Sequence, residues 1–152
     1  MRNKKYSTLV SIVAIVMVFV LTVPLSTNAA TIEPAQPRAS AYLRSYSAYV
    51  YPAGSGRIEV YFSVNGTGYM DEIGALQVSI YESKDNSTWT WVKSYSNENY
   101  SSMLEYDDYY HGSYVSYQGI GGRYYKAYVC VWAGKDGAGD TRYFWTSARQ
   151  AI

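Results

Sequence analysis

RIEVYFSVN, residues 57–65, alternates apolar and polar side chains without interruption. One face of this stretch carries four apolar side chains, namely Ile58, Val60, Phe62 and Val64. A period of two is typical of a β-strand with one buried face and one face toward water. Because half-buried strands of this kind belong to antiparallel sheets, the stretch predicts an antiparallel all-β fold.

The same alternation recurs on both sides of this stretch and is interrupted at short intervals by glycine, asparagine and aspartate. Asn65-Gly66-Thr67-Gly68 is expected to end the first strand, and residues 83–87 to turn a hairpin. Residues 97–110 show no clean period, and we interpret them as an excursion with one helical turn around 101–106. Further strands are predicted over residues 42–51, 76–82, 89–95, 114–118, 123–133 and 141–147. About seven strands fit an antiparallel two-sheet sandwich of the immunoglobulin-like kind.

The first thirty residues differ from the rest of the 152-residue chain. Basic side chains near Met1 are followed by the apolar run 9–23 and then by small residues, which is the plan of a secretory signal peptide. We therefore expect a cleaved signal at 1–30, a flexible lead-in at 31–40 and a β-sandwich domain at 41–152. A retained membrane anchor is the alternative for the apolar run.

Charge and cysteine content exclude several partners. Removal of the signal also removes Arg2, Lys4 and Lys5, which leaves ten Lys and Arg against twelve Asp and Glu. A weakly acidic chain without a basic cluster is a poor binder of nucleic acid. The sequence after residue 23 contains no second apolar run long enough to predict a membrane span. The single Cys130 can form no disulfide within the chain. The oligomeric state stays open.

The sequence holds few catalytic or metal-binding combinations. Cys130 and His111 are the only thiol and imidazole, but Cys130 lies in the middle of a predicted strand, so a structural role is favoured. His111 is expected to end a loop. One histidine is poor zinc chemistry, and the aspartates of 136–140 lack the spacing of a calcium loop. We expect no cofactor, no metal and no catalytic residue.

Aromatic side chains are the most unusual part of the composition, because 18 of the 19 Tyr and all four Trp follow residue 30. The aliphatic residues nearly suffice for a core, so many aromatic rings must face outward. The period of two places four of them opposite the core, as a candidate binding strip: Tyr61, Tyr81, Tyr128 and Trp132. Such rings bind sugars or proteins, although cross-strand pairing that stabilises the sheet is an equal alternative.

Two resemblances add to this reading. Gly121 to Val129 (GGRYYKAYV) resembles the sixth strand of immunoglobulin-like and fibronectin type III-like domains, which implies that Tyr125 is an inward corner tyrosine whose hydroxyl bonds to upstream backbone. Ala127 stands where antibody-type domains have a cysteine. Across the domain, the segments MDEIGA (70–75), IYES (80–83), WTWVK (89–93), RYYKAYV (123–129), AGKDG (133–137) and RYFWT (142–146) look like an uncharacterised family of small secreted proteins of Gram-positive bacteria. That resemblance implies secretion and a small all-β domain, and no site residues.

Together these observations predict a secreted, non-enzymatic domain that recognises a cell-envelope polysaccharide or a surface protein. Two alternatives stay open. One is a small secreted hydrolase that uses Asp107, Asp108 or the Cys130 and His111 pair. The other is a bacteriocin-like or inhibitor protein.

Overall fold

The computed structural model describes residues 40–152, and the predicted signal peptide and most of the lead-in lie outside them. The described chain is antiparallel and built of strands. Its elements are β1 (Leu43–Gly54), β2 (Arg57–Ser83), β3 (Thr90–Ser96), a 3₁₀ turn (Ser101–Met103), β4 (Leu104–Gln118), β5 (Tyr124–Lys135), β6 (Ala138–Trp145) and β7 (Arg149–Gln150). No helix in this part of the chain is long and apolar enough to cross a membrane. The prediction of an all-β antiparallel fold with about seven strands is confirmed.

β2 organises the sheet because its two ends pair with different strands. Residues 57–65 pair with β1 on one side and β4 on the other, and residues 77–82 lie between β3 and β5. β6 and β7 both pair with β5. We call the first group the β1/β4 half of the sheet and the second the β5/β6 half. All seven strands belong to one hydrogen-bonded sheet, so the expected division into two separate sheets is not present.

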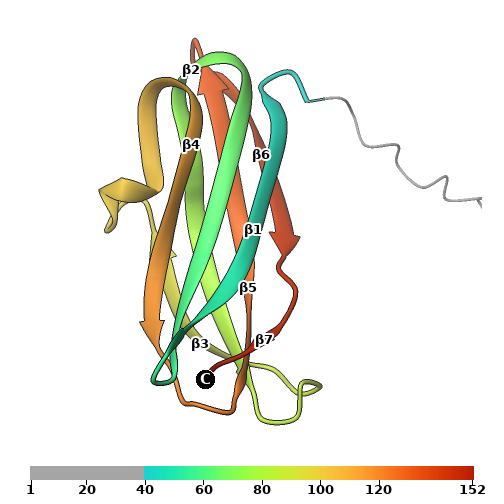
Figure 1. The fold of residues 1–152 in the computed structure, drawn as a ribbon. Helices are drawn as coiled ribbons and strands as arrows, with labels where there is room; N and C mark the ends of the chain where they lie inside the picture. The colour runs from blue at the N-terminus through green and yellow to red at the C-terminus, as the bar shows by residue number, and fades with distance from the viewer. Residues whose placement is uncertain (1–39) are drawn as a thin grey trace, which may run out of the picture. The chain divides into compact units, whose positions relative to one another are not determined.

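The sheet curls because β2 and β4 fold over together at one end of the molecule (Figure 1). The sequence analysis expected β2 to end at residues 65–68, but the strand continues to Ser83. β4 follows it around the bend, pairing with Asn65 through Tyr110 and with Met70 through Asp108. The bend is tight at Gly66, where a Cβ atom would lie 2.7 Å from the carbonyl oxygen of Gly68. A glycine is therefore needed at this position.

The two halves enclose a common core. Fully buried side chains come from both ends of β2 and from β5: Ile58, Val60, Val64, Ile73, Val78, Ile80, Tyr125, Val129 and Val131. Tyr95 of β3 also links the halves, because its hydroxyl donates to the carbonyl oxygen of Ser116 in β4 at 2.6 Å. β1 and β6 are the two ends of the strand order β1-β2-β5-β6. They are in contact through Tyr46 of β1 and Phe144 of β6, whose ring centroids lie 5.0 Å apart. The predicted inward faces of 57–65 and 123–133 are confirmed.

The prediction of an excursion over residues 97–110 is wrong for residues 104–110, which belong to β4. Only Ser101–Met103 is helical, and β4 already begins at Leu104. Asp107 has a left-handed φ of 54°, and the register with β2 shifts between the pairs Asn65–Tyr110 and Met70–Asp108. This irregularity removes the period of two from a segment that is nevertheless a strand. Leu76 is only half-buried, unlike Val78 and Ile80 of the same strand, because it is the extra residue of a bulge between Ala75 and Gln77.

Candidate functional site

Aromatic rings cover much of the outward surface between Ser40 and Ile152. Twelve Tyr and Trp side chains are exposed: Tyr46, Tyr49, Tyr51, Tyr69, Trp91, Tyr100, Tyr106, Tyr109, Tyr110, Tyr114, Tyr143 and Trp145. Exposed aromatic residues are enriched in binding surfaces compared with the rest of a protein surface. The aromatic surface is therefore the candidate functional surface of the described residues.

The four residues of the candidate strip lie in three places. Tyr61 lies in the β1/β4 half. Tyr81 and Tyr128 lie in the β5/β6 half, where both pack against Trp145 with centroid distances of 5.0 and 4.8 Å. Trp132 lies farther along β5, and its ring covers Gly134 of β5 and the paired Gly139 of β6. All four are half-buried, and only Tyr81 and Tyr128 are brought together.

Tyr61 is the centre of a row of three tyrosines that crosses β1, β2 and β4. Its direct partners in the register are Tyr49 and Tyr114. The ring of Tyr61 stacks on Tyr49 at 5.2 Å with an interplanar angle of 8°, and on Tyr114 at 5.0 Å with 28°. We call these three residues the tyrosine row. Cross-strand aromatic pairs stabilise a sheet, and here they also hold the rings in fixed positions.

The central ring is fixed by its hydroxyl as well. The Tyr61 hydroxyl donates to Oε2 of Glu59 at 2.7 Å. This hydrogen bond is the main cause that raises the pKa of Tyr61 to about 12. The Tyr61 phenol is therefore neutral at physiological pH.

A groove of about 390 Å³ lies beside the tyrosine row on the same outward face. Its floor is the next row of the register, Ser47, Ser63 and Gly112, whose side chains are small. The two serine hydroxyls are hydrogen-bonded to each other at 2.9 Å. The hydroxyl end of Tyr110 lies over Gly112, in the space that a Cβ atom would need. We call this groove the trough.

A second aromatic surface lies on the β5/β6 half. Trp145 is its centre and contacts Tyr81 and Tyr128, and Tyr128 stacks on Tyr143 at 5.9 Å. The ammonium group of Lys126 lies 4.4 Å from the ring centroids of both Trp89 and Trp145. This surface differs from the tyrosine row, since it contains a cation held by two rings.

Sequence reasoning missed Tyr49, Tyr114, Trp145 and the trough. Period two had already placed Tyr49 opposite Val50, so its outward direction could have been found. Its place beside Tyr61 could not, because strand order is not encoded in periodicity. The same limit applies to Trp145 and Tyr128, which are paired across β5 and β6.

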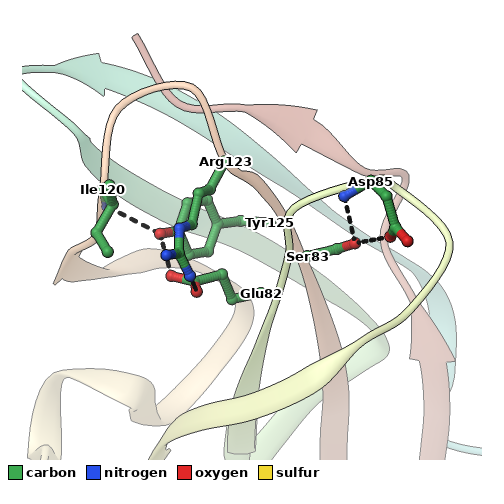
Figure 2. A network of polar contacts seen from close by, with 6 residues as sticks. All are labelled: Glu82, Ser83, Asp85, Ile120, Arg123 and Tyr125. Carbon is green, nitrogen blue, oxygen red and sulfur yellow. Dashed lines mark hydrogen bonds and ion pairs between the residues drawn. The ribbon is translucent and has the colours of Figure 1, made fainter.

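Figure 2 shows a polar network at the C-terminal end of β2 and the N-terminal end of β5. This network stabilises the fold. The Tyr125 hydroxyl accepts a hydrogen bond from the backbone N–H of Ile120 at 2.8 Å and donates one to Glu82 Oε2 at 2.5 Å. Arg123 pairs with the other oxygen of Glu82. Burial, followed by the bond to Glu82, raises the pKa of Tyr125 to about 12. The predicted inward position of Tyr125 and its bond to upstream backbone are confirmed.

The neighbouring turn also uses its own polar groups, as Figure 2 shows for Ser83 and Asp85. Oδ1 of Asp85 accepts the Ser83 hydroxyl at 2.8 Å and the backbone N–H groups of Ser87 and Thr88 at 2.9 and 2.8 Å. These bonds hold the pKa of the Asp85 carboxyl well below its usual range, the N–H of Thr88 contributing most. Asp85 therefore closes the β2–β3 hairpin, which confirms the hairpin predicted over 83–87.

The thiol and the imidazole of the hydrolase alternative are not brought together. Cys130 lies on the side of β5 opposite to Val129 and Val131 and is buried beside Tyr143, and this burial raises the pKa of its thiol. His111 lies on β4, not at the end of a loop as expected. Its Nε2 is 2.9 Å from the carbonyl oxygen of Ser102, and its ring packs near the inward Phe62. Mid-strand placement of Cys130 is confirmed.

The aspartates mostly bond to nearby backbone. Oδ1 of Asp108 accepts from the N–H groups of Tyr109 and Tyr110 at 2.6 and 3.2 Å. Asp136 is in a left-handed turn, and Asp140 accepts from the Ser40 hydroxyl and the Tyr42 N–H at 2.5 and 3.0 Å. Across residues 40–152, no group of three His, Cys, Asp or Glu side chains could hold a metal ion.

Comparison with protein-family models and with curated proteins gives no match to this chain. The resemblances noted in the sequence therefore stay predictions. The geometry of the outward aromatic surfaces is the basis for a functional conclusion.

Proposed function

We propose that this chain is a secreted, non-enzymatic recognition domain that binds a polymer of the cell envelope through outward-facing aromatic side chains. The observation that carries the proposal is the tyrosine row with its exposed ends. Tyr49 and Tyr114 are 55% and 50% exposed even though each stacks on Tyr61. Mutual stacking therefore leaves about half of each outer tyrosine available to a ligand.

Rigidity supports binding over a purely structural role. The central ring, Tyr61, is held between Tyr49 and Tyr114 by stacking and is bonded to Glu59 through its hydroxyl. A ligand that docks on such rings does not have to order them first, so less conformational entropy is lost on binding. Tyrosine combines a large apolar area with a polar hydroxyl, which suits ligands that expose both C–H and O–H groups.

Secretion is the second part of the proposal. It rests on the order of basic, apolar and small residues in positions 1–30. Mass spectrometry of the culture medium should find a chain that starts at Ala30 or Thr31. Recovery of only the full-length chain, in the membrane fraction, would contradict this part.

Sedimentation with isolated envelope material tests the binding activity. The purified protein should sediment with envelope fragments of the producing organism, and should still do so after the fragments have been digested with protease. Loss of binding after protease would instead identify a surface protein as the partner. Absence of sedimentation with either preparation would reject the recognition proposal.

A further inference from the structure

We propose that the trough binds an uncharged glycan chain that runs across β1, β2 and β4. This inference rests on the proposed function and names the ligand of one of the two aromatic surfaces. Its starting point is the lining of the trough, which consists only of uncharged residues: Ser47, Tyr49, Tyr61, Phe62, Ser63, Tyr110, Gly112, Ser113 and Tyr114. A charged ligand would lose water here without gaining an opposite charge, which is unfavourable.

The floor of the trough offers hydroxyl groups. Ser47 and Ser63 share one hydrogen bond between their oxygens. Each hydroxyl has one donor and two acceptor sites, so this bond leaves one hydroxyl hydrogen and several lone pairs free for a ligand. The Tyr110 hydroxyl end lies over Gly112 in the same row. A ligand with many donors and acceptors of similar strength matches this floor, and a sugar chain has them on every unit.

The wall of the trough favours the same ligand. Tyr49 and Tyr114 stack in an offset manner on the two faces of Tyr61, at centroid distances of 5.2 and 5.0 Å, so both faces of Tyr61 are partly shielded. The row then presents ring edges beside the serine floor, while the Tyr61 hydroxyl is directed toward Glu59 on the other side of the row. Aromatic edges carry partial positive charge and attract oxygen lone pairs. The wall therefore suits the oxygen-rich rim of a sugar ring better than an apolar peptide side chain.

The row of small residues that ends at Gly112 gives the direction in which the glycan would run. A glycine weakens the middle of a strand and commonly marks a close approach of another group. Here the small row Ser47, Ser63 and Gly112 crosses three strands, a span of about 10 Å at the usual strand spacing. The tyrosine row is two residues away along the strands. A chain that follows the floor must run perpendicular to the strands, with the tyrosine row along one side.

The test separates the polysaccharides of the envelope into a neutral and an anionic fraction by anion exchange, and measures the affinity of the full-length or secreted protein for each by calorimetry. The double substitution Ser47→Val and Ser63→Val removes both floor hydroxyls and fills the trough with methyl groups. Valine favours strands, so the fold should survive, and melting curves check this. Ser116→Val is the matched control, because Ser116 is an exposed serine of β4 on the other side of the tyrosine row.

We expect the wild-type protein to bind the neutral fraction and the double variant to bind it about tenfold more weakly, as for the loss of one or two hydrogen bonds. Ser116→Val should change the affinity less than about twofold. Gly112→Ala, which displaces the hydroxyl end of Tyr110, should weaken binding in the same direction and serves if the double variant does not fold.

Two results would overturn the inference while leaving the proposed function intact: binding confined to the anionic fraction, or unchanged affinity of folded trough variants for the neutral fraction. Binding confined to the anionic fraction would point to the surface around Trp145, with its cation Lys126, and unchanged affinity of the trough variants would place the ligand on the tyrosine row outside the trough. Failure of the wild-type protein to bind either fraction or the intact envelope would reject the proposed function itself.

Discussion

At the scale of single residues, Tyr125 shows how one side chain connects sequence, fold and stability. It is fully buried, and its hydroxyl joins the turn before β5 to Glu82 of β2. The resemblance of residues 121–129 to the sixth strand of immunoglobulin-like domains predicted its inward direction and a bond to upstream backbone, without naming the partner. The sequence did not predict Glu82 or Arg123, because these contacts depend on β2 and β5 being neighbours.

We expect Tyr125→Phe to lower the free energy of unfolding by about 1–2 kcal/mol, because Ile120 N–H and Glu82 both lose a partner. Chemical denaturation measures this change. Tyr124→Phe is the control, since Tyr124 is half-buried on the opposite side of the same strand, and should differ from wild type by less than about 0.5 kcal/mol. Equal effects of the two substitutions would contradict the role given to the Tyr125 hydroxyl.

Asp85 makes stability depend on acidic pH. Its pKa is lower in the folded chain than the ordinary value near 3.8, so its contribution is present above that value and is lost as pH falls through the folded pKa. Asp85→Ala should therefore lower the melting temperature at neutral pH, and the difference from wild type should shrink below about pH 4. A difference that stays constant down to the lowest pH at which the protein folds would show that charge is not involved.

Cys130 tests the hydrolase alternative at the same scale. Only 6% of the residue is exposed, and burial raises the pKa of the thiol, so little reactive thiolate forms at neutral pH. A thiol reagent should label the folded protein slowly, and Tyr143→Ala, which uncovers the thiol, should speed labelling. Rapid labelling of the wild-type protein would instead indicate an activated nucleophile.

At the scale of elements, β2 joins the two halves of the sheet, and Gly74 is part of this junction. Gly74 lies where β2 pairs with both β4 and β5. Its φ is 147°, and a Cβ atom there would collide with the carbonyl oxygen of Met103. The backbone of Met103 cannot move as easily as a side chain, so this position requires glycine.

Gly74→Ala should lower the free energy of unfolding by about 2–4 kcal/mol through strain and displaced backbone. Gly68→Ala is the matched control in the same strand, because a Cβ atom at Gly68 meets nothing within 4 Å. It should change stability by less than about 1 kcal/mol. Urea denaturation of both variants makes the comparison, and a tolerant Gly74 would contradict the requirement for glycine at this position.

Element prediction succeeded where alternation was regular and failed where backbone irregularities broke it. The strands at 57–65 and 123–133 have inward and outward residues as expected. The first half of β4 was missed because the left-handed Asp107 interrupts the alternation. The continuity of β2 through Gly66 was missed because glycine and asparagine ordinarily end strands, and only the hydrogen bonds to β4 show that this strand continues.

At the scale of the whole molecule, the sequence predicted outward aromatic residues but not the surfaces they form. Each of the four candidate residues lies opposite core neighbours in its strand, yet they are distributed over both halves of the sheet. Neighbours across strands are decided by strand order and register, which depend on long-range pairing. Tyr49 and Tyr114 lie beside Tyr61 because β1 and β4 are the neighbours of β2 in the sheet (Figure 1). This neighbourhood cannot be deduced from the alternation within one strand.

The most direct test of the recognition account measures envelope-polymer affinity and melting temperature in parallel for Tyr49→Ala and Tyr114→Ala, with Tyr69→Ala as the control. Tyr69 is also exposed, at 64%, and lies outside the tyrosine row. The account predicts that each row variant loses about 1–2 kcal/mol of binding free energy with a nearly unchanged melting temperature, and that the control keeps both. Affinity that falls only in step with melting temperature, or equally in the Tyr69 variant, would show that the tyrosine row serves the fold and not a ligand.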